Sequence, residues 1–163
     1  MIYDQVEQAY VVLAANFAAD YAALLTAKGV ASPGAVTLIK RQGVPTALRY
    51  RQAPPFMGVV SLAAATQAKD QGKRDNRGLV AYDIYIKGGT PDLVAAQVEL
   101  AAQAVMQTID ALAASGNGVF GAAELPGSCT ITLSDDEDEE VEEGQYGRRA
   151  TVSFPVWDRD EGL

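Results

Sequence analysis

The chain contains no histidine and a single cysteine, Cys129. These two counts limit the catalytic and metal-binding chemistry that it can perform. Histidine is the side chain most used for proton transfer near pH 7 and the commonest metal ligand. Its absence excludes His-based triads and zinc sites with histidine ligands. Cys129 lies within an apolar alternation, and without a histidine to activate it we expect a buried, inert thiol. We therefore predict a protein that is not an enzyme, with no catalytic residues, no metal site and no cofactor.

A glycine-rich stretch, Gly116–Gly121, imitates part of a dinucleotide-binding fingerprint. That motif requires a strand before it and a helix after it, whereas this stretch follows a predicted helix. A glycine-rich phosphate loop with its lysine is also missing from the sequence. Nucleotide binding is therefore not predicted.

The strongest compositional signal is a run of acidic residues between positions 135 and 143. Its eight members are Asp135, Asp136, Glu137, Asp138, Glu139, Glu140, Glu142 and Glu143. They carry the whole net charge of −8, because the other 13 acidic residues are matched by 13 Lys and Arg. Such dense like charge predicts a loop, and it lacks the spaced ligands and glycine turn of a calcium loop. Four interpretations stay open: a solvated surface, adventitious binding of divalent cations, a loop that repels a polyanion, or one that docks on a basic partner.

Basic residues form a possible counterpart to this acidic run. The candidates for contacts between subunits are Arg41, Arg49, Arg51, Lys73, Arg74 and Arg77. They are interpreted either as an ordinary solubilising rim or as partners for the acids of a neighbouring copy. Few aromatic residues are interleaved with them, which argues against reading of single-stranded nucleic acid.

The clearest elements that could position these charges are a strand over 79–87 and the helix that follows it. Gly88-Gly89 ends the strand, and Thr90 with Pro91 is typical of a helix start. The residues that alternate onto the predicted core face of the strand are Val80, Tyr82, Ile84 and Ile86. The apolar stripe of the helix is Val94, Val98, Ala101, Val105, Ile109 and Leu112.

The remaining elements follow the same periodicities. We expect a helix over 4–28 ended by Gly29, a hairpin over 35–51, and strands over 56–66, 128–134 and 148–157. This order predicts an α+β fold, with a mostly antiparallel sheet packed by the N-terminal helix and the long central helix. Residues 1–163 are expected to form one domain, with mobile loops at about 67–78 and 135–147. No stretch is expected to span a membrane, and the first residues lack the positive start of a secretory signal, which predicts a cytoplasmic protein.

The arrangement of these elements resembles the tail-terminator (tail-completion) proteins of tailed bacteriophages. The resemblance is carried by an opening helix that begins Ile2-Tyr-Asp-Gln-Val-Glu-Gln-Ala9, and by a strand, Val80–Ile86, that enters the long helix through Gly-Gly-Thr-Pro-Asp92. A terminal strand, Arg149–Val156, completes it. The resemblance implies a compact α/β sandwich with helices against one sheet face.

The same resemblance implies a structural virion protein without catalytic residues, made in the host cytoplasm. It would form a hexameric ring that caps the tail tube, joins a head-side connector or stopper protein, and lets DNA pass through a central channel. The acidic loop would then face the channel or dock on a partner. Two alternatives stay open: another neck or minor tail protein such as a head–tail connector, or a small ligand-binding module that holds an anion at the helix N-terminus near Gly88–Asp92.

Overall fold

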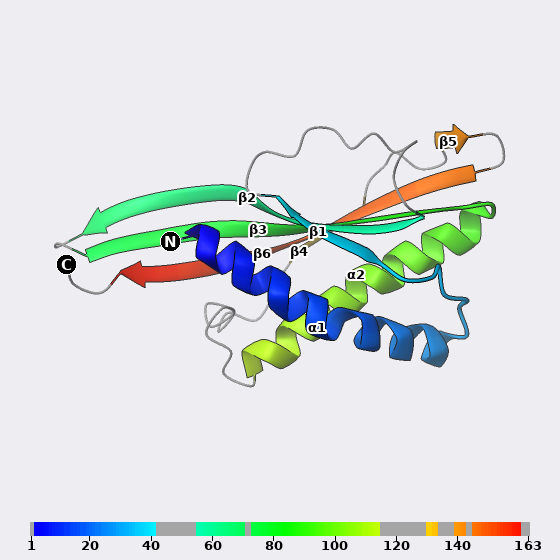
Figure 1. Ribbon diagram of the computed structural model, residues 1–163, viewed down its shortest axis with the longest axis horizontal. Helices are drawn as coiled ribbons and strands as arrows, with labels where there is room; N and C mark the ends of the chain where they lie inside the picture. Colours follow the sequence, from blue (N-terminus) through cyan, green and yellow to red (C-terminus); the bar gives the residue numbers. More distant parts are fainter. Residues whose placement is uncertain are drawn as a thin grey trace.

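The computed structural model describes residues 2–41, 55–70, 73–114, 130–133, 139–142 and 145–160. In chain order the elements are α1 (Ile2–Lys28), β1 (Thr37–Arg41), β2 (Phe56–Asp70), β3 (Lys73–Gly88), α2 (Pro91–Ala114), β4 (Thr130–Leu133), β5 (Glu139–Glu142) and β6 (Gln145–Asp160). Both helices lie on the same face of one sheet and cross each other there (Figure 1). The predicted α+β class is confirmed.

The sheet has the strand order β1-β2-β3-β6-β4, and β5 pairs with the start of β6. Every described pairing is antiparallel except that of β1 with β2, which is parallel. The prediction of a mostly antiparallel sheet is therefore confirmed. Of the hairpin expected over 35–51, only the first strand lies within the described residues, as β1.

The core lies between the helices and the sheet face that they cover. The predicted inward residues of β3 are all fully buried, and Phe56 and Val60 of β2 and Phe154 of β6 lie in the same cluster. The stripe of α1 that reaches this cluster is Val6, Ala9, Leu13, Phe17, Tyr21 and Leu25. The stripe of α2 includes Val94, Val98, Ala101, Val105 and Ile109. The periodicity in the sequence thus identified the helix-facing side of β3, the described part of the α2 stripe and most of the buried side of α1.

The expected mobile loop at 67–78 is wrong, because β2 and β3 continue as paired strands to Asp70 opposite Lys73. The physical reason is visible in the register of β3 with its neighbours. Toward β6, Asp75 stands opposite Arg159 and Arg74 opposite Asp160; toward β2, Lys73 stands opposite Asp70, whereas Arg74 also stands opposite Lys69. Three opposite-charge pairs against one like-charge pair favour the ladder although apolar alternation is missing from this stretch.

The expected loop at 135–147 is also wrong in part. Glu139–Glu142 form β5, and residues 145–147 already belong to β6. The acidic residues of β5 pair with Gly147, Tyr146 and Gln145, which are uncharged. Carboxylates therefore do not stand opposite carboxylates in this ladder, and the charge density does not prevent a strand.

One segment, Ala9–Lys28 of α1, is long and apolar enough to span a membrane by length and composition, with a mean hydropathy of 1.4. The sequence had led us to expect no such segment. The buried side of this helix supplies Leu13, Phe17 and Tyr21 to the core, and the Tyr21 hydroxyl donates a hydrogen bond to the Gln97 carbonyl of α2 at 2.8 Å. In this fold one side of the segment packs into the core.

Helix α1 ends at a glycine in the left-handed conformation, as predicted. Gly29 has φ of 66°. Its N–H donates to the Thr26 carbonyl at 3.2 Å, and the Val30 N–H donates to the Leu25 carbonyl at 3.0 Å. These two bonds form a Schellman motif, which satisfies carbonyls that a helix end would otherwise leave without partners.

Replacing Gly29 by alanine is expected to lower the free energy of unfolding by about 1–2 kcal/mol, because an L side chain disfavours the left-handed region by that amount. No atom lies within 4 Å of a Cβ added there, so the loss would come from the backbone alone. Gly29→Asn is the matched control and should lose less, because asparagine tolerates this conformation better. Urea denaturation of the three proteins checks the order, and equal stability of the glycine and alanine forms would contradict it.

Candidate interaction surfaces

Part of the acidic run lies at one end of strand β6. Of its eight residues, Glu139, Glu140 and Glu142 lie in β5, which pairs with residues 145–147 at the start of β6. The other five, Asp135, Asp136, Glu137, Asp138 and Glu143, lie outside the described residues. Arg148 and Arg149 come directly after the residues of β6 that pair with β5, so two basic residues follow the acidic strand closely in the sequence.

The predicted basic residues are divided between two strands. Lys73, Arg74 and Arg77 lie at the start of β3, and Arg41 is the last residue of β1. Arg49 and Arg51 lie outside the described residues. The structure therefore brings three of the six candidates together and separates Arg41 from them by placing it in another strand.

These three bases belong to a ribbon that we call the β arm, defined as residues 64–70 of β2, 73–79 of β3 and 155–160 of β6. The arm extends past the start of α1, beyond the part of the sheet that the helices cover (Figure 1). It is a mixed-charge element rather than a basic one. Its bases are Lys69, Lys73, Arg74, Arg77 and Arg159, and its acids are Asp70, Asp75, Asp158 and Asp160.

The acidic strand and the end of the β arm stand at opposite ends of β6. Gln145 pairs with β5, whereas Asp160 pairs with Arg74 near the end of the arm. Fifteen residue steps of about 3.3 Å separate them, which is roughly 50 Å. The same separation is visible in Figure 1, where β5 and the end of the β2–β3 ribbon occupy opposite ends of the molecule. Within one chain Glu139, Glu140 and Glu142 therefore lie far from the bases of the arm.

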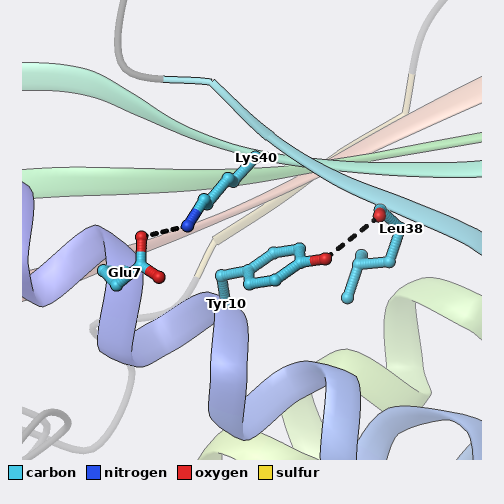
Figure 2. Close-up of polar contacts among 4 residues, drawn as sticks. All are labelled: Glu7, Tyr10, Leu38 and Lys40. Carbon is cyan, nitrogen blue, oxygen red and sulfur yellow. Dashed lines mark hydrogen bonds and ion pairs between the residues drawn. The ribbon is translucent and has the colours of Figure 1, made fainter.

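A polar contact that sequence analysis did not predict joins α1 to the outer strand β1 (Figure 2). The Lys40 ammonium forms an ion pair with the Glu7 carboxylate and lies 5.4 Å from the centroid of the Tyr10 ring. The Tyr10 hydroxyl donates a hydrogen bond to the Leu38 carbonyl at 3.3 Å. The Lys40 and Glu7 side chains are 39% and 47% exposed, so this ion pair contributes little stability and serves to place β1 against α1.

This contact left no signal in the sequence, because Glu7 and Lys40 are 33 residues apart and belong to different elements. Spacing rules describe neighbours on one helix or one strand, whereas this pair depends on how the two elements pack. It also removes Lys40 from the cations that could bind a partner.

Two buried polar side chains, Gln97 and Thr108, form hydrogen bonds to distant parts of the chain. The Gln97 side-chain amide donates to the Ala31 carbonyl at 2.8 Å. The Thr108 hydroxyl lies 2.5 Å from an Asp20 carboxylate oxygen and thereby links the two helices. These bonds hold distant parts of the chain together. Among the described residues, no three side chains of the His, Cys, Asp and Glu types are grouped so as to hold a metal ion.

The start of α2 was the alternative anion site. The Val94 N–H already donates to the Thr90 carbonyl at 3.0 Å, as the predicted N-cap requires. Asp92 is exposed in the first turn and places a negative charge where an anion would bind. This charge opposes the anion-binding alternative, because it already uses the favourable field of the helix N-terminus.

Among the described residues, the two charged features of the fold are therefore an acidic strand at one end of β6 and a mixed-charge arm at the other. In comparisons of sequence, no protein-family model and no curated protein matches this chain.

Proposed function

We propose that this protein is a structural component of a tailed-phage virion, a tail terminator that forms a hexameric ring, caps the tail tube and joins it to the head-side connector or stopper. The observation that carries the proposal is the placement of two chemically different surfaces at opposite ends of β6, roughly 50 Å apart at about 3.3 Å per residue. A protein that joins two different partners needs two such ends.

A ring explains how these ends would be used. If copies stand side by side with their β6 strands in the same direction, all acidic strands lie on one face of the ring and all arm ends lie on the other. Heterologous contacts of this kind close into a ring when the rotation between neighbours allows it. The face that carries Glu139, Glu140 and Glu142 would dock on a basic surface of one partner, and the mixed-charge face would dock on the other. DNA would pass through the channel without specific binding.

Light scattering at several concentrations, with negative-stain imaging of the same samples, tests this proposal. We expect a mass of six chains and rings with a central hole, either for the protein alone or when tail tubes are added. A chain that stays monomeric with and without tubes would contradict the proposal. A compact, stable dimer would also contradict it and would favour the ligand-binding alternative.

Replacing Glu139, Glu140 and Glu142 together by glutamine tests the role of the acidic face separately. The ring should still form, because these residues are not at the side of the ring in this arrangement. Binding to one of the two partners should weaken, and its dependence on salt concentration should decrease, because fewer charges contribute to the contact. Unchanged binding to both partners would contradict the claim that the acidic face docks on one of them.

A further inference from the structure

Among the described residues, the β arm has two open edges. In this part of the chain β1 pairs with β2 only as far as Ser61, and β4 pairs with β6 only between Ala150 and Ser153. Within the arm, β2 and β6 each pair with β3 and with no other described strand. An open strand edge offers a row of backbone N–H and C=O groups to which a strand of another chain can add.

The two edges are suited to each other. β2 and β6 both run antiparallel to β3, so they run parallel to one another and border the arm on opposite sides. The β6 edge of one copy can therefore receive the β2 edge of the next copy as a parallel ladder. Each addition leaves the same kind of open edge at either end, which is the requirement for a heterologous, repeating contact.

The residues in register support this occupant. Lys69, Arg74 and Asp160 occupy one row of the arm, because Arg74 is the partner of both others. When two arms meet at equal height, Asp160 of one copy stands beside Lys69 of the next, and Asp158 and Arg159 stand beside the uncharged Gln67 and Ala68. The contact thus brings together one pair of opposite charges and no pair of like charges.

A two-fold contact between two β6 edges lacks this complementarity. Centred on Arg159, such an antiparallel pairing places Arg159 opposite Arg159 and Asp158 opposite Asp160. Like charges directly opposite each other are destabilising in a ladder. Pro155 has no N–H to donate, which limits the usable β6 edge to Val156–Asp160.

We propose that neighbouring copies of this chain join through their β arms, with residues 156–160 of β6 in one copy paired in parallel with residues 65–69 of β2 in the next. This contact would be the interface that closes the ring. The number of copies in the ring rests on the proposed function. The arm contact itself makes a prediction that does not depend on that number.

A pair of cysteines tests the contact. In one chain the Cα atoms of residues 69 and 160 are two strand spacings apart, about 10 Å, since β3 lies between them. A disulfide needs Cα atoms within about 7 Å, so cysteines at these positions can be bridged only between copies. We expect the variant K69C/D160C, made in a C129S background, to give a series of covalent oligomers after mild oxidation. On a non-reducing gel the series should end at six chains, and reduction should return it to one band.

The controls distinguish the contact from the ring. T66C/D160C uses the same two strands three residues out of register and should give no series. Rings in the micrographs without cross-linking of K69C/D160C would overturn the arm contact and leave the proposed function intact. A series that ends at another number, or does not end, would support the arm contact and contradict the hexamer. Dimers formed by R159C alone in the C129S background would overturn the contact in favour of the two-fold one, because only that pairing places residue 159 opposite itself. A chain that is monomeric under all conditions would contradict both.

Discussion

Replacing Phe17 by alanine is expected to lower the free energy of unfolding by about 3–5 kcal/mol, the range for truncating a buried phenylalanine. Phe17 is 1% exposed and is the aromatic residue of α1 that faces the middle of the sheet. Its ring centroid lies 5.5 Å from that of Tyr21, 5.5 Å from that of Tyr82 and 6.2 Å from that of Phe56. Alanine would remove three aromatic contacts and leave a cavity that the neighbouring rigid rings cannot fill by small movements.

A matched control lies on the same helix. Val11 is 56% exposed, so Val11→Ala should change stability by no more than about 0.5 kcal/mol. Because domains of this kind are stable by only about 5–15 kcal/mol, the Phe17 variant should unfold at a clearly lower urea concentration, as followed by far-UV circular dichroism. Similar midpoints for the two variants would mean that α1 is not seated on the sheet through this face.

The core of the fold could be predicted because hydrophobic periodicity reports burial directly. The alternation through Val80 and Ile86 and the three-and-four spacing along both helices identified residues that the structure buries. The end of the first helix and the start of the second could also be predicted. Gly29 adopts the left-handed conformation and Thr90 caps a helix N-terminus, and few other residues do either as well. On the first helix the spacing predicts a stripe of Val6, Tyr10, Leu13, Phe17, Tyr21 and Leu24. Tyr10 and Leu24 are only partly buried, whereas Ala9 and Leu25 are fully in the core.

The length of the strands could not be predicted by the same rule. Residues 67–78 lack an apolar alternation, so their composition is typical of a loop, yet β3 is held there by ladders on both sides. The parallel pairing of β1 with β2 was also beyond local patterns, because it depends on which strands meet after folding. Likewise, Met57, Val59 and Tyr85 are buried on the sheet face opposite the helices. The sequence pattern gave that face only a mixed character.

For the candidate site, the sequence identified the charges but not their geometry. The acidic run could be recognised from the composition of the sequence. The distance of its β5 residues from the bases of the arm depends on the length of β6, which the sequence pattern does not give. The interpretation of residues such as Arg74 as surface cations changes once Asp160 is seen to occupy the partner position. Charge partners across a sheet depend on register, and register is not contained in the spacing of one strand.

Gly58 shows a further packing constraint, and its replacement by alanine is expected to cost about 1–3 kcal/mol through overpacking. A Cβ at this position would press on the Tyr82 hydroxyl oxygen, and it would lie 2.9 Å from Tyr82 Cζ and 3.0 Å from Leu38 Cδ1. The Tyr82 ring is fully buried and cannot swing aside. Glycine is therefore required where the end of this side chain crosses β2.

Removing the Tyr82 hydroxyl tests whether this group contributes to stability through packing or through hydrogen bonding. Within the described structure it is buried without a hydrogen-bond partner, and burial raises the pKa of Tyr82 above its ordinary value. Tyr82→Phe should therefore leave stability unchanged or increase it, because a buried hydroxyl without a partner costs about 1–3 kcal/mol. Tyr21→Phe is the matched contrast and should lose about 1 kcal/mol, since it removes the 2.8 Å hydrogen bond to the Gln97 carbonyl.

Combining Gly58→Ala with Tyr82→Phe completes the test as a double-mutant cycle. Removing the hydroxyl removes the most severe of the three contacts that the new methyl group would make, so the double variant should recover part of the loss. We expect a favourable coupling of at least about 0.5 kcal/mol, the size typical of residues in direct contact. Urea denaturation of the four proteins measures it. Strictly additive effects would show that Gly58 is needed for its backbone or for Leu38, and that the end of the Tyr82 side chain does not determine the spacing of the sheet at this point.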